Sequence, residues 1–375
     1  MCLPIMTVFV CLGTVAELIK LAPVVVALRE NGAKVVGIAT GQNDLRSSDL
    51  YATTFPAGTL GPVMSSPPRP TTLAFGLWAA LCLFSAPMVL RRAFRSEGSD
   101  RPKLIVHGDT VSTLIATLAG RIGGAEIVHV EAGLRSFHLL RPFPEELCRI
   151  WVSRFATWAF CPGEWAVHNL RASRIPHIIN TQENTLADSM RMALARPWGE
   201  GVDGQLPPRY FLFICHRQEN LLDNKFLRAI IARIEAAADN LPCVAIIHKP
   251  AAAALAKQGL LNRLELHPSI KTLPRQGYID FTHMLQRAEY IVTDGGSNQE
   301  ESFYLGKPCL LLRKETERHE GLGENVILSR KDPAIITEFF KDPYRFARLP
   351  FPVNYRPSII IAAELLYQTK TLQEN

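Results

Sequence analysis

Four polar runs carry the residues of this sequence that could perform acid–base chemistry and bind an anion. Each run directly follows an apolar, strand-like stretch. The runs are Gly108-Asp109-Thr110 after LIVH, Glu131-Ala132-Gly133-Leu134-Arg135 after IVHV, His216-Arg217-Gln218-Glu219-Asn220 after FLFIC, and the run from Asp294 to Glu301 after YIVT. Ligands bind at the carboxyl ends of strands in doubly wound sheets, so these positions predict a site that combines carboxylates, a histidine and donors for an anion.

The fourth run predicts a phosphate-binding turn. Gly295, Gly296 and Ser297 are small enough for the backbone to approach a phosphate closely. The helix expected after them would offer its first N–H groups to the anion. The turn therefore predicts a diphosphate as its ligand.

Each of these residues also has a structural interpretation without catalysis. Asp109 could cap the helix that follows it, and Glu131 could be a loop carboxylate paired with Arg135. His216 alone is more often structural than catalytic, and Glu145-Glu146 after Pro144 has the pattern of a first helical turn. The occurrence of all these groups at strand ends in two lobes favours a functional site.

The elements that must position these residues alternate between apolar strands and helical stretches, a pattern typical of parallel sheets built from βαβ units. Seven strands are expected, at residues 35–39, 104–107, 127–130, 211–215, 244–248, 290–293 and 309–312. The Gly- and Pro-rich residues 195–208 predict a linker or a loop that begins a domain. We therefore expect an α/β fold with one Rossmann-like lobe at residues 1–175 and a second at 176–355.

Length and composition agree with an ordinary folded protein of two domains. The chain has 375 residues, 47% of them hydrophobic and 20% charged, with a net charge of +6. The basic residues are scattered, so nucleic acid is not expected as a partner. The eight cysteines contain no C-x-x-C pair and no metal-ligand spacing, which favours reduced thiols and a cytoplasmic protein. The first ten residues lack the pattern of a secretory signal.

Residues 73–90 (LAFGLWAALCLFSAPMVL) carry no charge over a length that could span a bilayer, and Arg91, Arg92 and Arg95 follow. Gly76, Ser85 and Pro87 interrupt the run, which lies between strand-like segments. A core or surface-docked helix is the favoured interpretation. A membrane-docking helix over residues 73–95 is kept as the alternative.

The ordered set of motifs resembles the UDP-N-acetylglucosamine 2-epimerase family. The set comprises His107-Gly108-Asp109-Thr110, His129 to Arg135, Pro144-Glu145-Glu146, His216 to Asn220, Thr293 to Glu301, Leu305-Gly306-Lys307-Pro308 and Thr316-Glu317-Arg318. The resemblance extends from Gly13-Thr14 to about Leu328. It implies two Rossmann-like lobes of the glycosyltransferase-B type, an active site in the interdomain cleft, and a C-terminal helix at 356–375 that returns to the first lobe.

The resemblance also implies roles for individual residues. Asp109, Glu131 and Glu145 match the acid–base carboxylates of the family, and His216 matches the histidine that contacts the UDP diphosphate. Phe281 falls at the position of the aromatic beside uracil, and Glu301 at the carboxylate that binds ribose. Substrate binding is further implied for the phosphate-loop and basic residues Lys20, Arg149, Arg217, Gly295, Gly296, Ser297 and Arg318.

The activity implied is interconversion of UDP-N-acetylglucosamine and UDP-N-acetylmannosamine. It proceeds by deprotonation at C2 and anti-elimination of UDP, through a glycal and without metal or cofactor. The resemblance also leads us to expect a homodimer. The hydrolysing reaction, which releases UDP and N-acetylmannosamine, stays open, as do a glycosyltransferase acting on a membrane acceptor and a non-catalytic nucleotide-sugar-binding protein.

Two departures from the family pattern stand out. Val15 replaces an arginine of the family's opening motif, and Gln42-Asn43-Asp44 replaces a Gln-His-Arg pattern that is linked to activation by substrate.

Overall fold

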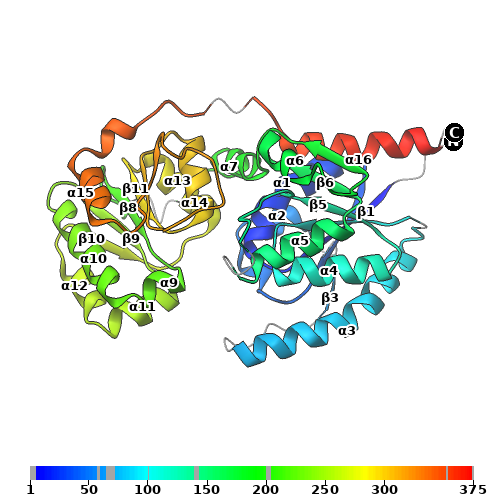
Figure 1. Cartoon of the computed structure of the whole chain (residues 1–375), viewed down its shortest axis with the longest axis horizontal. Coiled ribbons are helices and arrows are strands. Elements are labelled where there is room, and N and C mark those ends of the chain that lie inside the picture. The colour runs from blue at the N-terminus through cyan, green and yellow to red at the C-terminus, as the bar shows by residue number, and fades with distance from the viewer. Residues whose placement is uncertain are drawn as a thin grey trace. The chain divides into compact units, whose positions relative to one another are not determined.

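The computed structural model describes residues 6–56, 60–64, 72–99, 101–138, 143–199, 204–351 and 354–373. They form two compact units, shown in Figure 1. Unit 1 comprises Met1–Ser189 and Asn354–Asn375, and unit 2 comprises Met190–Val353.

Unit 1 is built on a seven-stranded sheet with the order β3-β2-β1-β4-β5-β6-β7, in which every paired strand is parallel. Its central strands are buried on both faces, as parallel strands covered by helices are, and this explains their continuous apolar sequences. The strands are β1 (Thr7–Leu12), β2 (Lys34–Ala39), β3 (Leu60–Val63), β4 (Lys103–His107), β5 (Glu126–Val130), β6 (Trp158–Cys161) and β7 (His177–Asn180).

The helices of unit 1 connect these strands and cover the sheet. Helix α16 packs against α1, and its Ile361 and Leu365 share a core cluster with Leu21 and Val25 of α1. The α-helices are α1 (Val15–Glu30), α2 (Tyr51–Thr54), α3 (Thr72–Ser96), α4 (Val111–Ile122), α5 (Glu145–Phe155), α6 (Glu164–Leu170), α7 (Leu186–Leu194) and α16 (Pro357–Gln373), with a short 3-10 helix at Leu45–Ser47.

Unit 2 contains a six-stranded parallel sheet with the order β10-β9-β8-β11-β12-β13. Its strands are β8 (Phe211–Ile214), β9 (Cys243–Ile246), β10 (Ile270–Leu273), β11 (Ile291–Thr293), β12 (Cys309–Leu311) and β13 (Val326–Leu328). Its α-helices are α9 (Gln218–Leu221), α10 (Asn224–Ala238), α11 (Lys249–Ala256), α12 (Leu260–Leu266), α13 (Tyr278–Arg287), α14 (Gly296–Tyr304) and α15 (Pro333–Lys341), followed by a 3-10 helix at Pro343–Phe346.

Both sheets have the strand order of the Rossmann fold, so the predicted α/β class with two Rossmann-like lobes is confirmed. All seven strands expected from the sequence are present. The order reverses between β1 and β4 in unit 1 and between β8 and β11 in unit 2. These are the switch points at which such sheets bind ligands.

The boundary between the units differs from the sequence expectation. Strand β7 pairs with β6, so residues 176–189 belong to unit 1 and not to the second lobe. The division falls at Ser189 and Met190, inside α7, rather than near residue 175. The sequence did not predict β7 as a strand of unit 1, because β7 is short and half-buried and its sequence, HIIN, carries little strand signal.

Residues 73–90 belong to α3, which lies beside α4 in unit 1 (Figure 1). Its buried side chains, among them Trp78, Cys82, Ala86 and Leu90, form a core cluster with Phe9 of β1. Helix α3 is long and apolar enough to cross a membrane by length and composition. In the structure it covers the sheet as one helix of the unit.

Candidate active site

Glu131 lies directly after β5 and is held by buried partners. Lys20 of α1 forms an ion pair with its carboxylate, and Asn184 donates a hydrogen bond to the same oxygen. His107 Nε2 lies 3.7 Å from that oxygen. The backbone of Glu131 has a φ of 62°, a left-handed conformation that a non-glycine residue adopts only when its surroundings enforce it. The structure thus places Lys20 beside Glu131, and Arg135 is not its partner.

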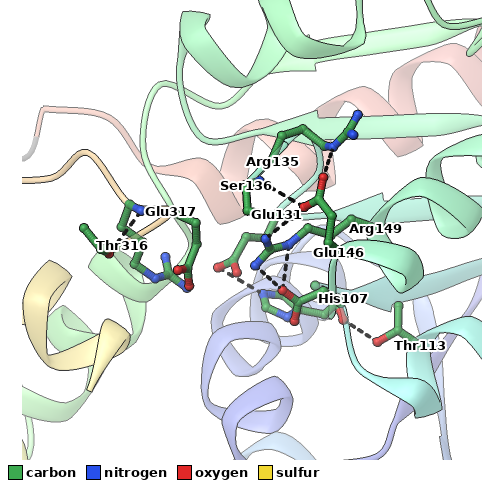
Figure 2. A network of polar contacts seen from close by, with 12 residues as sticks. His107, Thr113, Glu131, Arg135, Ser136, Glu146, Arg149, Thr316 and Glu317 are labelled. Carbon is green, nitrogen blue, oxygen red and sulfur yellow. Dashed lines mark hydrogen bonds and ion pairs between the residues drawn. The ribbon is translucent and has the colours of Figure 1, made fainter. Parts of the chain in front are cut away.

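A chain of charged side chains connects Asp109 to the loop after β5. Figure 2 shows Arg149, Glu146 and Arg135 of this chain. Arg149 of α5 donates from Nε to Asp109 Oδ2 at 2.8 Å, and its Nη1 lies 3.4 Å from Glu146. Arg135 Nε lies 2.5 Å from Oε1 of Glu146, whereas the backbone N–H of Ser136 donates to Oε2, the oxygen near Arg149. Burial would raise the pKa of Glu146, but the hydrogen bonds from Ser136 and Arg135 outweigh it and lower the pKa.

Glu145 begins α5, as the pattern after Pro144 indicates, and it keeps one carboxylate oxygen unengaged. Its Oε2 is buried and has no hydrogen-bond partner among the residues that the structure describes. Burial raises the pKa of the Cys148 thiol to about 12, and the charges of Asp109 and Glu145 add to this effect. The charges of Asp109 and Glu145 thus both raise the pKa of the same thiol.

Glu17 is a buried carboxylate at this switch point that the sequence interpretation did not select. It accepts hydrogen bonds from the backbone of Gly13 at 2.6 Å and of Thr14 at 3.3 Å, and from Thr110 Oγ1 at 2.6 Å. Burial raises its pKa to about 6, against these hydrogen bonds, and the Asp109 charge adds to the rise. Glu17 thus joins the turn after β1 to the turn after β4. The sequence signal that could have identified Glu17 is the capping-box pattern that it forms with Thr14.

Asp109 does not cap the following helix, because Thr110 does. The Thr110 side chain accepts a hydrogen bond from the backbone of Thr113 at 3.1 Å. The capping interpretation of Asp109 is therefore wrong, and its carboxylate binds Arg149 instead.

The two sequence departures lie near the same end of the sheet. Val15 is the first residue of α1 and is buried. Gln42 accepts a hydrogen bond from Ser112 at 2.6 Å, and Asp44 caps the 3-10 helix that begins at Leu45. The departures thus have structural roles in unit 1.

In unit 2, Asp294 clasps the segment that follows β8 to the end of β11. Its buried carboxylate accepts hydrogen bonds from the backbone of His216 at 3.1 Å and of Arg217 at 3.0 Å, and from Asn220 Nδ2 at 2.9 Å. This clasp lies at the switch point between β8 and β11. The sequence indicated Asp294 only as part of the phosphate turn.

His216 is half-exposed above this clasp, with Nδ1 3.2 Å from Asp294 Oδ1. Its ring stacks on His248 with 5.3 Å between ring centroids. Burial lowers the pKa of His216, and Arg217 and Arg275 lower it further, against the opposing charge of Asp294. Burial likewise lowers the pKa of His248 to about 4. Both shifts favour the neutral form of the imidazole rings.

The predicted phosphate turn lies against His216. Gly295 precedes the first residue of α14, and its backbone N–H binds Thr293 Oγ1 at 3.0 Å. A Cβ at Gly295 would lie 3.3 Å from His216 Cε1, and one at Gly296 would lie 3.2 Å from Arg318 Nε. The turn, the imidazole and the guanidinium of Arg318 thus form one group at the start of a helix, suited to an anion.

The carboxylates around this turn fix its basic residues. Arg318 Nη1 lies 2.6 Å from buried Glu300, and Arg313 Nη2 lies 3.0 Å from Glu317. Glu301 is buried and accepts a hydrogen bond from Asn298 at 2.9 Å. Arg313 and Glu300 were not predicted. Glu300 pairs with Arg318, which lies 18 residues away in the sequence, whereas the partner of Arg313 lies only four residues away.

Phe281 of α13 is half-buried and packs against the core cluster that contains Leu285. The predicted residues thus fall into two groups. Lys20, Asp109, Glu131, Glu145 and Arg149 lie in unit 1, and His216, Arg217, Phe281, Gly295, Gly296, Ser297, Glu301 and Arg318 lie in unit 2. Within the described ranges, no cluster of three His, Cys, Asp or Glu side chains could hold a metal ion.

Known proteins resemble this chain both in sequence and in structure. The UDP-N-acetylglucosamine 2-epimerase from Methanococcus maripaludis is 33% identical over 240 residues, which span 61% of this chain and 65% of that relative. The Methanocaldococcus jannaschii UDP-GlcNAc 2-epimerase in complex with UDP-GlcNAc and UDP superposes with a TM-score of 0.78 at 27% identity, covering 96% of this chain and all of that one. The enzyme from Neisseria meningitidis bound to UDP-GlcNAc gives 0.78 at 25% identity over 99% of this chain and all of that one.

These neighbours confirm the glycosyltransferase-B type of fold. The model of the family described as UDP-N-acetylglucosamine 2-epimerase matches residues 89–345, more than half of the chain. The chain therefore belongs to the UDP-N-acetylglucosamine 2-epimerase family, whose members are nucleotide-sugar epimerases.

Proposed function

We propose that this protein interconverts UDP-N-acetylglucosamine and UDP-N-acetylmannosamine. The observation that carries the proposal is the group of three carboxylates in unit 1, Asp109, Glu131 and Glu145, each at a strand end or the start of α5. Removal of the C2 proton needs a carboxylate base, and its return on the other face needs a second acid. Relatives named as UDP-N-acetylglucosamine 2-epimerases support the substrate.

Asp109 and Glu145 are the proposed proton-transfer pair. Arg149 holds Asp109 in place, while Glu145 keeps a buried oxygen available to a substrate proton. A carboxylate removes the C2 proton, the C1–O bond to UDP breaks with its electron pair leaving on the diphosphate, and the glycal forms. Re-addition of UDP with protonation at the opposite face of C2 completes the exchange. Glu131, paired with Lys20, is the third acid–base group.

Unit 2 is the proposed UDP-binding unit. His216, the N–H groups at Gly296 and Ser297, and Arg318 would bind the diphosphate and stabilise its charge as it leaves, and Gly295 would leave room for its close approach. An anion near Nε2 favours the imidazolium form of His216, because Nδ1 already faces Asp294. Phe281 would lie beside uracil and Glu301 would bind ribose, with Arg217 as a further basic group.

The test compares Asp109→Asn with wild type in deuterated water containing UDP-N-acetylglucosamine. Loss of the carboxylate should lower deuterium incorporation at C2 about a hundredfold or more, while UDP affinity in unit 2 stays within about twofold. Asp332→Asn, at the cap of α15 in unit 2, is the matched control and should exchange like wild type. Normal exchange in Asp109→Asn would remove Asp109 from the mechanism.

Proton NMR of the products formed in deuterated water separates the alternative reactions. UDP-N-acetylmannosamine with deuterium at C2 supports epimerisation, whereas UDP with free N-acetylmannosamine would assign the hydrolysing reaction. The hydrolysing reaction remains an alternative because Val15 replaces the family arginine, so a bidentate contact to the anion is missing. UDP release that requires a membrane acceptor would assign a glycosyltransferase.

We further propose that the protein is cytoplasmic, as its dispersed cysteines favour, and that it is a homodimer, as the resemblance implies. Sedimentation velocity of the purified chain tests the dimer, and a monomer at all concentrations would contradict it.

A further inference from the structure

Helix α3 of unit 1 presents an apolar stripe to solvent. Leu73, Leu77, Leu81, Phe84 and Met88 recur at intervals of three or four residues, so they lie on one side of the helix. Leu73 is 86% exposed and Phe84 is 83% exposed. The stripe runs for roughly 22 Å along the helix at about 1.5 Å per residue. Contiguous exposed apolar surface of this kind marks an interaction site.

The opposite face of α3 fixes the helix to its unit. Trp78, Cys82, Ala86 and Leu90 belong to the core cluster that includes Leu104 of β4. A helix that spanned a bilayer would have to leave this core. Yet only 22% of the most apolar 18-residue window of α3 is buried, whereas the core helix of a soluble protein is mostly buried. The geometry fits a helix that lies at the protein surface. It neither spans a bilayer nor is buried as a core helix is.

The charges near the stripe are positive. Residues 72–96 contain no Asp or Glu, and Arg92 and Arg95 are exposed at the C-terminal end of α3. Arg91 donates a hydrogen bond to the backbone of Ile122 in the neighbouring α4 at 2.8 Å, which brings exposed Arg121 to the same end.

Among the residues that the structure describes in α3, in α4 and in the turn after α3, no carboxylate without a cationic partner offsets these arginines. Helix α4 contains no Asp or Glu. Glu97, just after α3, forms an ion pair with Lys34. The surface is therefore an apolar stripe flanked at one end by cations, which complements a lipid surface with negatively charged headgroups.

We propose that α3 docks unit 1 onto an anionic lipid bilayer, with the stripe from Leu73 to Met88 inserted at the headgroup boundary and the arginines on lipid phosphates. A second copy of the chain is the competing occupant. Apposed α3 and α4 helices of two copies would bring further arginines and no carboxylates to the contact, so charge favours lipid. The inference does not depend on the reaction proposed above.

The experiment is cosedimentation of the full chain with vesicles of phosphatidylcholine alone and with added phosphatidylglycerol. Wild type should bind the anionic vesicles and be released by salt. Leu77→Ser with Phe84→Ser should lower the vesicle partition coefficient by about tenfold or more, because two apolar side chains no longer enter the bilayer. Arg92→Gln with Arg95→Gln should lower it on anionic vesicles only, by about tenfold.

Leu266→Ser is the matched control, because Leu266 of α12 is 75% exposed but lies in unit 2. It should bind vesicles like wild type. No binding of wild type to either vesicle would overturn the proposal. The proposal would also be overturned if Leu77→Ser with Phe84→Ser lost self-association, measured by sedimentation velocity, but bound vesicles as wild type does. In that case the stripe is a contact between copies.

Discussion

Removal of the Asp294 carboxylate tests the clasp that positions His216. The substitution Asp294→Ala removes an acceptor from four donors, namely the backbone N–H groups of His216 and Arg217, the side-chain amide of Asn220 and the thiol of Cys215. Each hydrogen bond to a charged acceptor contributes about 1.5–3 kcal/mol, and water can reach the two part-buried backbone groups, so we expect unit 2 to lose about 4 kcal/mol. Asp294→Asn keeps one acceptor oxygen and should lose about 2 kcal/mol.

The assay is hydrogen exchange measured by mass spectrometry, because the two units need not unfold together. Peptides covering residues 211–222 and 289–300 should lose more protection in Asp294→Ala than in Asp294→Asn. Peptides from unit 1 should keep the protection that they have in wild type. The UDP affinity of both variants should fall, because the segment that carries His216 is no longer held. Asp332→Ala, which removes one capping hydrogen bond from α15, should cost only about 1 kcal/mol and leave UDP affinity unchanged. Protection within about 1 kcal/mol of wild type in Asp294→Ala would refute the reasoning.

Two further predictions concern unit 1. The pKa of Glu17 is raised from 4.5 to about 6, so the folded state binds its proton more tightly than the unfolded state. This contributes about 2 kcal/mol of stability that is present below pH 4.5 and lost as pH rises through 6. The free energy of unfolding of wild type, measured with denaturant, should therefore fall as pH rises, relative to that of Glu17→Gln. Parallel pH profiles of the two proteins would contradict this. Gly133→Ala, with a φ of 83° and a Cβ 2.3 Å from the Ala166 carbonyl oxygen, should cost about 3 kcal/mol or more. Gly32→Ala, at a similar φ with nothing within 4 Å, should cost only about 1 kcal/mol, and equal losses would show that the clash relaxes.

The positions of the candidate site residues could be predicted because they depend on a local pattern. Asp109, Glu131 and His216 each follow an apolar strand closely, and parallel strands bring their carboxyl ends to one edge of a sheet. Their partners could not be predicted in the same way. Lys20 and Glu131 are 111 residues apart, and His216 and Asp294 are 78 apart. Only the order of the strands in each sheet brings such residues together.

The sequence by itself determined the α/β class, because the alternation of apolar strands and helices is a local property of the chain. The tertiary structure decided where unit 1 ends, because the half-buried strand β7 is recognised by its pairing with β6 and not by its composition. It also decided the orientation of α3. The apolar side chains of Trp78 and Phe84 have the same local signature, yet one is buried in the core and the other faces solvent. The hydrophobic effect favours removing both from water, and only packing against the sheet determines which of them the unit itself can cover.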